Sequence, residues 1–309
     1  GNPLFITELL AALQQEGAIQ VVEGRAEIAE ATLPPTLRLT ILRRLSFLPE
    51  DTLQVLQAAS ILGSAFSLTD LVLTSGRPAI GLTAALAEAI RSRVVEDDGV
   101  RLRFRHDLIR DSIYEDLPAS VRRGLHREAA VRLAQSGTAA LRVAEHFARG
   151  ATAGDGEAIE WLIKAAREAA PGSPGAAAGL LDRAITIMQP LDPRRDRLLA
   201  ERAGSLMLTG RITDAEMISR GLLDRPHDRA VEAAARMCLA RALLAQGRLR
   251  DGLTEMERAA ESPALTEAER AAAQAFAGFA RLSTGDLDGA AGAAEQASST
   301  ASLADDPFP

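Results

Sequence analysis

Lysine is almost absent from this sequence, although arginine is abundant. Lys164 is the only lysine, and it lies in the apolar helical segment Trp161-Leu162-Ile163-Lys164. A phosphate-binding loop of the GxxxxGK[ST] type needs a lysine directly after a glycine-rich turn. The sequence therefore excludes such a loop. Glycine-rich dinucleotide fingerprints and GxSxG elbows are missing as well, so we expect no enzymatic activity and no cofactor in these residues alone.

Aromatic residues and cysteine are also scarce. Aromatic residues make up 3% of the chain, while apolar residues make up 47% and Ala, Leu and Arg dominate. This balance is typical of packed helices, so we expect a mainly α fold. Cys238 is the single cysteine, which excludes an internal disulfide. It stands between Met237 and Leu239, where we expect an inert buried thiol in a reducing, cytoplasmic compartment.

Three further features are missing: excess positive charge, a long apolar run and metal-ligand spacing. The net charge of −7 argues against a nucleic-acid footprint. No stretch approaches the ~20 consecutive apolar residues of a membrane span, and residues 1–20 lack a basic region before an apolar core. The histidines follow no zinc-site spacing; they are His106, His126, His146 and His227. We therefore expect neither a membrane partner nor a bound metal.

The first residues have the pattern of a capped amphipathic helix. Asn2 is suited to cap the first free N–H groups, and Pro3 suits the first helical position because its φ is already near the helical value. Apolar residues at positions 5, 9, 12 and 13 then fall on one stripe. Gly1-Asn2-Pro3 thus begins a helix that we expect to pack on a domain.

A β-prone run at 18–22 is followed by apolar periodicity that predicts helices. The expected helices cover 36–48, 51–62, 67–74 and 79–92. Asp98-Gly99 between two β-prone runs predicts a hairpin over 94–104. Three helices and then a hairpin is the order of a winged helix, a fold often used on DNA. On the second strand Arg101, Arg103 and Arg105 share one face, but Glu96, Asp97 and Asp98 lie across the turn and are placed to neutralise them, so we expect no direct DNA contact.

A distinctive motif follows the hairpin. The segment Phe104-Arg105-His106-Asp107-Leu108 leads to Tyr114, and Arg122 and His126 come after it. Together with Gly1-Asn2-Pro3, this order resembles the STAND-class signalling ATPases, and within them the LuxR-type large ATP-binding transcription regulators, over residues 1–127. Those regulators show a similar FRHxLxRxxxY run followed by RxxLH. The residues alone also allow another interpretation, in which His106 is a polar residue at the end of a strand and Asp107 is the N-cap of the next helix.

The resemblance implies a nucleotide switch. In that family the proline of a Gly-x-Pro lid helix lies against adenine, and the histidine of a Met-His-Asp motif reaches the β-phosphate of ADP and holds the inactive state. The implied cofactor-binding residues here are Gly1, Asn2, Pro3, His106 and Asp107. Arg105 stands in place of the motif methionine, and ATP or ADP would belong to the parent protein.

The second half repeats. Gly172, Gly210, Gly247 and Gly285 are 38, 37 and 38 residues apart. Small residues recur at three fixed distances from these glycines. Seven positions before them lie Ala165, Ala203, Ala240 and Gly278, and five positions after them lie Ala177, Ala215, Gly252 and Ala290. Twelve positions after them lie Ala184, Ala259 and Ala297, with the larger Leu222 at the second glycine. The pattern resembles tetratricopeptide repeats with a slightly longer period, each unit a helical hairpin stacked on its neighbours. The last helix lacks a polar capping helix after it, so we expect more repeats in the parent protein.

These patterns predict four segments and one function. The four segments are the end of an ATPase lid with a helical linker over 1–48, a winged-helix-like domain over 49–117, a helical linker over 118–154 and a tetratricopeptide-like solenoid over 155–309. The expected function is the sensor segment of a LuxR-type regulator, with a protein or small-molecule effector, or self-association, on the repeats. Two alternatives stay open: the regulatory arm of a nucleotide cyclase or protein kinase, and a stand-alone scaffold.

Overall fold

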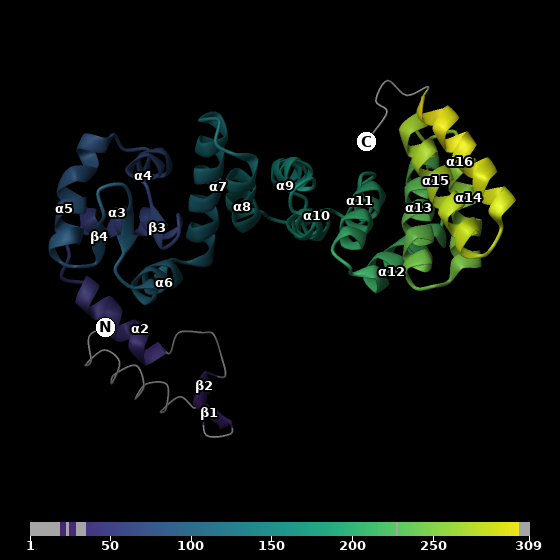
Figure 1. Ribbon diagram of the computed structural model, residues 1–309. Coiled ribbons are helices and arrows are strands. Elements are labelled where there is room, and N and C mark those ends of the chain that lie inside the picture. Colours follow the sequence, from purple (N-terminus) through teal and green to yellow (C-terminus); the bar gives the residue numbers. More distant parts are fainter. Residues whose placement is uncertain (1–18, 23–24, 29–34, 227, 303–309) are drawn as a thin grey trace. The chain divides into compact units, whose positions relative to one another are not determined.

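The structure is a computed structural model that describes residues 19–22, 25–28, 35–226 and 228–302. Over these residues the chain is mainly helical, as predicted, with fifteen α-helices from α2 to α16 (Figure 1). It divides into two compact units, Gly1–Thr138 and Ala139–Pro309, and this boundary falls inside the expected linker 118–154. Among the described residues, no helix combines the length and apolar content that crossing a bilayer requires.

The described part of the first unit begins with a two-stranded antiparallel hairpin. Strands β1 (Ile19–Val22) and β2 (Arg25–Ile28) pair with Val22 opposite Arg25. The expected β run at 18–22 is confirmed from Ile19 onward, whereas β2 is an addition to the prediction. The helix expected over 1–13 lies outside the described residues.

The rest of the first unit is a set of helices around a small sheet. In chain order its elements are α2 (Pro35–Leu45), α3 (Glu50–Ser60), β3 (Ala65–Phe66), α4 (Leu68–Ser75), η1 (Ala79–Leu82), α5 (Thr83–Arg91), β4 (Val95–Asp97), β5 (Leu102–Phe104), α6 (Asp107–Asp116) and α7 (Ala119–Gln135). The predicted helices and hairpin are confirmed, with end shifts of a few residues. The sheet is antiparallel in the order β3-β5-β4. Strand β3 was not predicted, because a two-residue strand has no periodicity to detect.

The hairpin β4–β5 closes the core of this unit. Leu102 and Phe104 are buried, while Arg103 between them is exposed, as strand alternation predicts. The Phe104 ring lies 5.8 Å from that of Phe66, centroid to centroid, in a tilted arrangement. Fully buried Leu56 packs in the same core. The apolar face of the hairpin therefore fixes its arginines on the outside.

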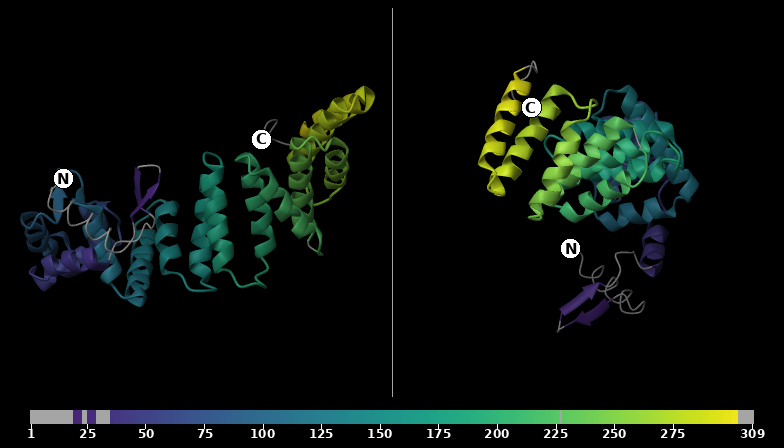
Figure 2. Two further views of the ribbon diagram at one scale, coloured as in Figure 1. Left: turned by 90° about the horizontal axis from the view of Figure 1, so that it is seen from below. Right: turned by 90° about the vertical axis from the view of Figure 1, so that its right-hand side faces the viewer.

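The second unit is a row of helical hairpins. Its helices are α8 (Ala140–Gly150), α9 (Gly156–Ala169), α10 (Pro174–Ile187), α11 (Arg195–Leu208), α12 (Ile212–Leu223), α13 (Arg229–Ala245), α14 (Leu249–Ala260), α15 (Glu267–Ser283) and α16 (Leu287–Ala301). Each helix packs on the next, and α11 also contacts α13, as α13 contacts α15. Figure 2 shows these helices side by side in chain order. The predicted hairpins α9–α10, α11–α12, α13–α14 and α15–α16 are confirmed.

In three of the four predicted turns, the glycine adopts a backbone conformation that other residues rarely adopt. Gly210, Gly247 and Gly285 have φ of 76°, 78° and 85°, which is the left-handed region that favours glycine. Gly172 does not adopt a positive φ, so the predicted equivalence of the four turns is wrong at this position. There α9 ends earlier, at a right-handed Ala170, and Pro171 follows it.

Small residues let the two helices of a hairpin approach closely, as the repeat pattern predicts. Ala165, Ala203 and Ala240 are almost fully buried. A Cβ added at Gly252 of α14 would lie 2.8 Å from Leu244 Cδ2 and 3.0 Å from the carbonyl oxygen of Ala240 on α13. At this point the hairpin has no room for a single methyl group.

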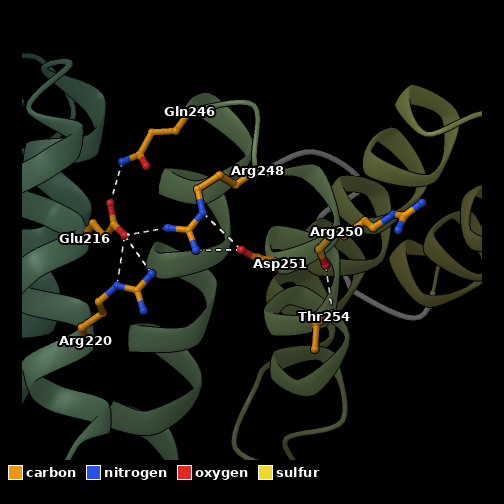
Figure 3. A network of polar contacts seen from close by, with 7 residues as sticks. All are labelled: Glu216, Arg220, Gln246, Arg248, Arg250, Asp251 and Thr254. Atoms are coloured by element: carbon orange, nitrogen blue, oxygen red, sulfur yellow. Dashed lines mark hydrogen bonds and ion pairs between the residues drawn. The ribbon is translucent and has the colours of Figure 1, made fainter.

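One half-buried carboxylate connects successive hairpins (Figure 3). Glu216 on α12 accepts from Gln246 Nε2 at 2.6 Å and from Arg248 at 3.4 Å, and both donors belong to the next hairpin. Arg220, one turn along α12, donates to it at 2.8 Å. Asp251 accepts from Arg248 at 2.7 Å and holds that guanidinium in place. The hydrogen bonds from Gln246 and Arg220 lower the pKa of Glu216, although burial acts in the opposite sense.

The close approach at Gly252 leads to a stability prediction. We expect Gly252→Ala to destabilise the chain by about 1–2 kcal/mol, because overpacking outweighs the gain in helix propensity. Gly221→Ala on α12 is the matched control, since nothing lies within 4 Å of a Cβ there; we expect it to stabilise by about 0.5–1 kcal/mol. Urea unfolding measures both, and equal effects at the two sites would contradict the close contact.

The Glu216 network leads to a pH prediction. Because the folded-state pKa of Glu216 is lowered from 4.5, its stabilisation is present above that pH and is lost as the pH falls through the lowered value. We expect Glu216→Gln to lose about 1 kcal/mol at pH 7 and to destabilise progressively less on acidification. Urea unfolding at pH 7 and pH 3 is the measurement, with exposed Glu168→Gln as control. A difference between Glu216→Gln and wild type that stays constant with pH would count against the network.

Candidate functional site

His106 stands at the junction of β5 and α6. It is half-buried and occupies the N-cap position of α6 with extended backbone angles, and its carbonyl oxygen accepts from the N–H of Ile109 at 3.0 Å. Asp107 is the first residue of the helix and is exposed. The prediction that Asp107 is the N-cap is therefore wrong by one position. Its carboxylate still lies in the first turn, where the helix dipole favours negative charge.

His106 lines a cavity of about 840 Å³ in the first unit. Its apolar walls come from α2 and the loop after it, from the residue before β4 and from α6: Ile41, Leu45, Leu48, Val94 and Ile109. Its charged rim comes from Arg44, Arg93, Arg105, His106, Glu88 and Glu96. A volume of this size is within the range of small-ligand sites, and apolar walls with a few polar groups are their usual lining.

On the rim, the positive charges that are available to a ligand outnumber the negative ones. Glu88 accepts from Arg91 and Ser92, and these bonds lower its pKa. Glu96 lies 3.7 Å from Arg105. Arg44 and Arg93, in contrast, enter no ion pair within the described ranges. Two uncompensated guanidinium groups beside a histidine favour an anionic ligand, because guanidinium binds phosphate and carboxylate through paired donors.

Arg93 has an unusual backbone conformation. Its φ is 57°, and it is the single non-glycine residue with a positive φ in the described part of the chain. It follows α5, and its N–H donates to the carbonyl oxygen of Ile90 at 3.0 Å, so it stands where a helix usually has a glycine. The left-handed region costs a non-glycine residue about 1–2 kcal/mol. The fold accepts this strain and thereby places a guanidinium on the rim of the cavity.

Most of the remaining motif residues form a separate structural cluster. Arg110 donates from Nε to the carbonyl oxygen of Ser60 at 2.7 Å, and its guanidinium lies 4.6 Å from the centre of the Tyr114 ring. The Tyr114 hydroxyl is 3.0 Å from Nε2 of the fully buried His126. The guanidinium carbon of Arg122 lies 5.1 Å from the centre of the same tyrosine ring. These residues tie α6 to α3 and α7, so packing alone accounts for this part of the motif.

Of the other predicted site residues, Asp107 does not line the cavity. Gly1, Asn2 and Pro3 lie outside the described residues. Sequence reasoning missed Arg44 and Arg93. A helix that is followed directly by a strand needs a tight turn, and such a turn usually has a glycine in the left-handed conformation. The absence of a glycine after α5 was therefore the only available signal for Arg93.

The hairpin acids lie close to the arginines, as predicted, and two of them also stabilise the turn. Asp98 accepts from the backbone N–H groups of Arg101 and Val100, which lower its pKa, and Asp97 accepts from that of Gly99. Glu96 forms an ion pair with the guanidinium of Arg105. The charges of Arg103 and Arg101 also lower the pKa of Asp98, although less than its backbone hydrogen bonds do. Asp97 and Asp98 therefore stabilise the turn first, since a tight turn leaves N–H groups without backbone partners.

The buried thiol matches its prediction. Cys238 is 5% exposed, and burial raises its pKa. A raised pKa keeps a thiol protonated and unreactive. In the part of the chain that the structure describes, no three histidine, cysteine or acidic side chains converge in a way that could hold a metal ion.

No protein-family model matches the chain. No curated protein sequence matches it either. Solved structures are similar at low identity. A signal transduction ATPase with numerous domains (STAND) with a tetratricopeptide repeat sensor, from Pyrococcus horikoshii, is 13% identical over 89% of this chain and 47% of that chain, with a TM-score of 0.42. MamA from Desulfovibrio magneticus RS-1 is 16% identical over 61% of this chain and 99% of its own, with a TM-score of 0.42.

A further similar structure is a kinesin light chain protein of Podosopora anserina with tetratricopeptide-like repeats. It is 19% identical over 60% of this chain and 98% of its own, with a TM-score of 0.41. At these identities and TM-scores the likenesses assign the chain to no family.

The strained turn at Arg93 leads to a prediction. We expect Arg93→Gly to be about 1 kcal/mol more stable than Arg93→Ala, since only glycine relieves the left-handed conformation and part of that gain is offset by the more flexible unfolded chain. Urea unfolding of the two variants measures the difference. The same pair of changes at the exposed Arg91, the last residue of α5, is the control and should favour alanine, because this position has a right-handed helical backbone. Equal stability of the two Arg93 variants would contradict the strain.

Proposed function

We propose that the chain is the regulatory and sensor segment of an ATP-dependent transcription regulator of the LuxR type, within the STAND class. In this proposal the first unit responds to the nucleotide and the second unit binds the effector. The observation that carries it is the position of His106, on the rim of an apolar-walled cavity beside Arg44 and Arg93. The resemblance selected this histidine for a phosphate contact, and its surroundings fit an anion.

The order of elements in the first unit supports a winged-helix assignment for 49–117. Three helices, α3, α4 and α5, precede the hairpin β4–β5, and β3 adds the third strand of the small sheet. This is the order that a winged helix requires. The wing would act in the switch and leave DNA to another domain of the parent protein, because the net charge is −7 and Arg105 is paired with Glu96.

A nucleoside diphosphate fits the residues of the cavity. Its phosphate groups would balance the excess positive charge of the rim, and His106, Arg44 and Arg93 are the residues that would hold them. A contact of this kind stabilises the closed state only if it is absent from the open state. In this proposal His106 therefore biases the switch and does no chemistry.

The second unit would be the sensor. Stacked hairpins present an extended surface that the core does not consume, and solenoids of this kind, including tetratricopeptide repeats, bind partners on such surfaces. The partner would be a protein or a small-molecule effector. Binding there would shift the switch only through different affinities for its open and closed states.

The role of His106 leads to a prediction for the full-length parent regulator. We expect His106→Ala to remove a contact worth on the order of 1–3 kcal/mol from the closed state only. A bias of that size shifts a two-state equilibrium by about ten- to a hundredfold, so the regulator becomes partly active without inducer. Reporter transcription and the rate of ADP release measure the effect.

Two further variants make this experiment specific. Asp107→Asn should act more weakly in the same direction, because Asp107 lies in the first turn of α6 next to the histidine. Arg103→Ala is the control, since Arg103 is exposed on β5 and does not line the cavity. A well-folded His106→Ala protein that stays fully inducer-dependent and releases ADP at the wild-type rate would refute the switch role.

A further inference from the structure

The cavity of the first unit has an exposed aromatic ring at its edge. Phe47 lies in the turn between α2 and α3 and lines the cavity. It is 88% exposed, and no other aromatic residue in the described part of the chain is as exposed. The core of this unit includes its neighbours Leu45 and Leu48 but not Phe47. Packing inside the unit therefore does not account for the ring at this position.

Backbone hydrogen bonds on both sides of Phe47 hold it at the cavity. The N–H of Ser46 donates to the carbonyl oxygen of Leu42, and the N–H of Leu48 donates to that of Leu45, both at 2.9 Å. Leu45 is buried and Leu48 is half-buried, and both line the same cavity. The backbone that carries the ring is thus fixed before a ligand arrives, which lowers the entropy that a contact with the ring costs.

The polar side chains of the cavity that could read the edge of a base are already paired. Among the described residues, Ser92 is the one lining residue with a hydroxyl or amide side chain, and its hydroxyl donates to Glu88 at 3.0 Å. The carboxylate of Glu88 also accepts from Arg91, and that of Glu96 lies 3.7 Å from Arg105. A site rejects the wrong ligand strongly when it is built to hydrogen-bond the right one. These side chains offer no such pattern to a base.

Stacking and charge, which this cavity does offer, do not distinguish one base from another. Every base has a π face, so an aromatic ring such as that of Phe47 stacks on any of them. The guanidinium groups of Arg44 and Arg93 would bind phosphate, which all nucleotides share. A ligand that reaches both kinds of group therefore needs a flat ring and an anionic group, and the identity of the ring is secondary.

We propose that Phe47 stacks on the base of the bound nucleotide, and that this cavity accepts nucleoside diphosphates whatever their base. The inference rests on the proposed function, since it takes the nucleotide site at His106 as given, and it adds the group that contacts the base. Any preference of the parent regulator for one base then comes from residues outside this cavity.

Titration calorimetry of the 309-residue chain with ADP, GDP and pyrophosphate tests the proposal. We expect the dissociation constants of ADP and GDP to agree within about threefold, because stacking tolerates either base. Pyrophosphate has the anionic group without the ring, so we expect it to bind about tenfold more weakly than ADP.

Variants of Phe47 separate the base contact from the anion contact. We expect Phe47→Ala and Phe47→Leu to weaken ADP binding by about tenfold and to leave pyrophosphate binding unchanged, whereas Phe47→Trp keeps the ring and retains ADP binding. Arg93→Ala should weaken all three ligands. Val100→Ala is the matched control, since Val100 is 84% exposed and does not line the cavity. Because Phe47 is exposed, its replacement leaves the core intact, and a circular dichroism melt checks folding.

The failure of this inference differs from the failure of the proposed function. If none of the three ligands binds, or if Arg93→Ala changes no affinity, the anion site is absent and both proposals are overturned. If the ligands bind and depend on Arg93, two results overturn the base contact alone. The first is an ADP affinity that Phe47→Ala leaves unchanged, and the second is a preference of about tenfold or more for one of the two nucleotides.

Discussion

A helical hairpin of the second unit has apolar residues on two sides, and neighbouring hairpins stabilise it by covering them. Close approach inside the hairpin is the first condition. Gly252 provides it, since any side chain there would meet the carbonyl oxygen of Ala240 and the side chain of Leu244. Cover from the next hairpin is the second condition, and Met256 is fully buried for this reason. Turn glycines, small residues and apolar stripes all serve these two contacts.

Apolar contacts of this kind do not by themselves fix which residues face each other. Alanine-rich faces slide at little cost, because one methyl group resembles the next. Glu216 opposes such sliding, since a carboxylate that is largely removed from water needs hydrogen-bond donors around it. Gln246 and Arg248 supply those donors from the next hairpin in one register only. A polar group in the interface thus trades some stability for a defined arrangement.

The sequence predicted the parts of the fold that depend on periodicity. Helices from α2 onward, the hairpin β4–β5 and the repeated helix pairs all have clear spacing, and the structure confirms them. Strand β3 was missed, because Ala65–Phe66 is defined by its partner Arg103–Leu102 and not by its own pattern. Asp107 was misplaced by one residue, since capping depends on backbone angles that a sequence does not display. The turn at Gly172 differs because Pro171 precedes it.

The candidate site was predictable only in part, for a related reason. His106 was singled out by its motif, whereas Arg44 and Arg93 come from separate elements that only the fold brings to one cavity. Arg93 also breaks a local rule, because glycine at its left-handed position would be less strained. A residue that stands against its backbone preference is more informative about a site than one that suits its position. In this chain the strained arginine and the motif histidine lie on the same rim, and two independent signals therefore point to one site.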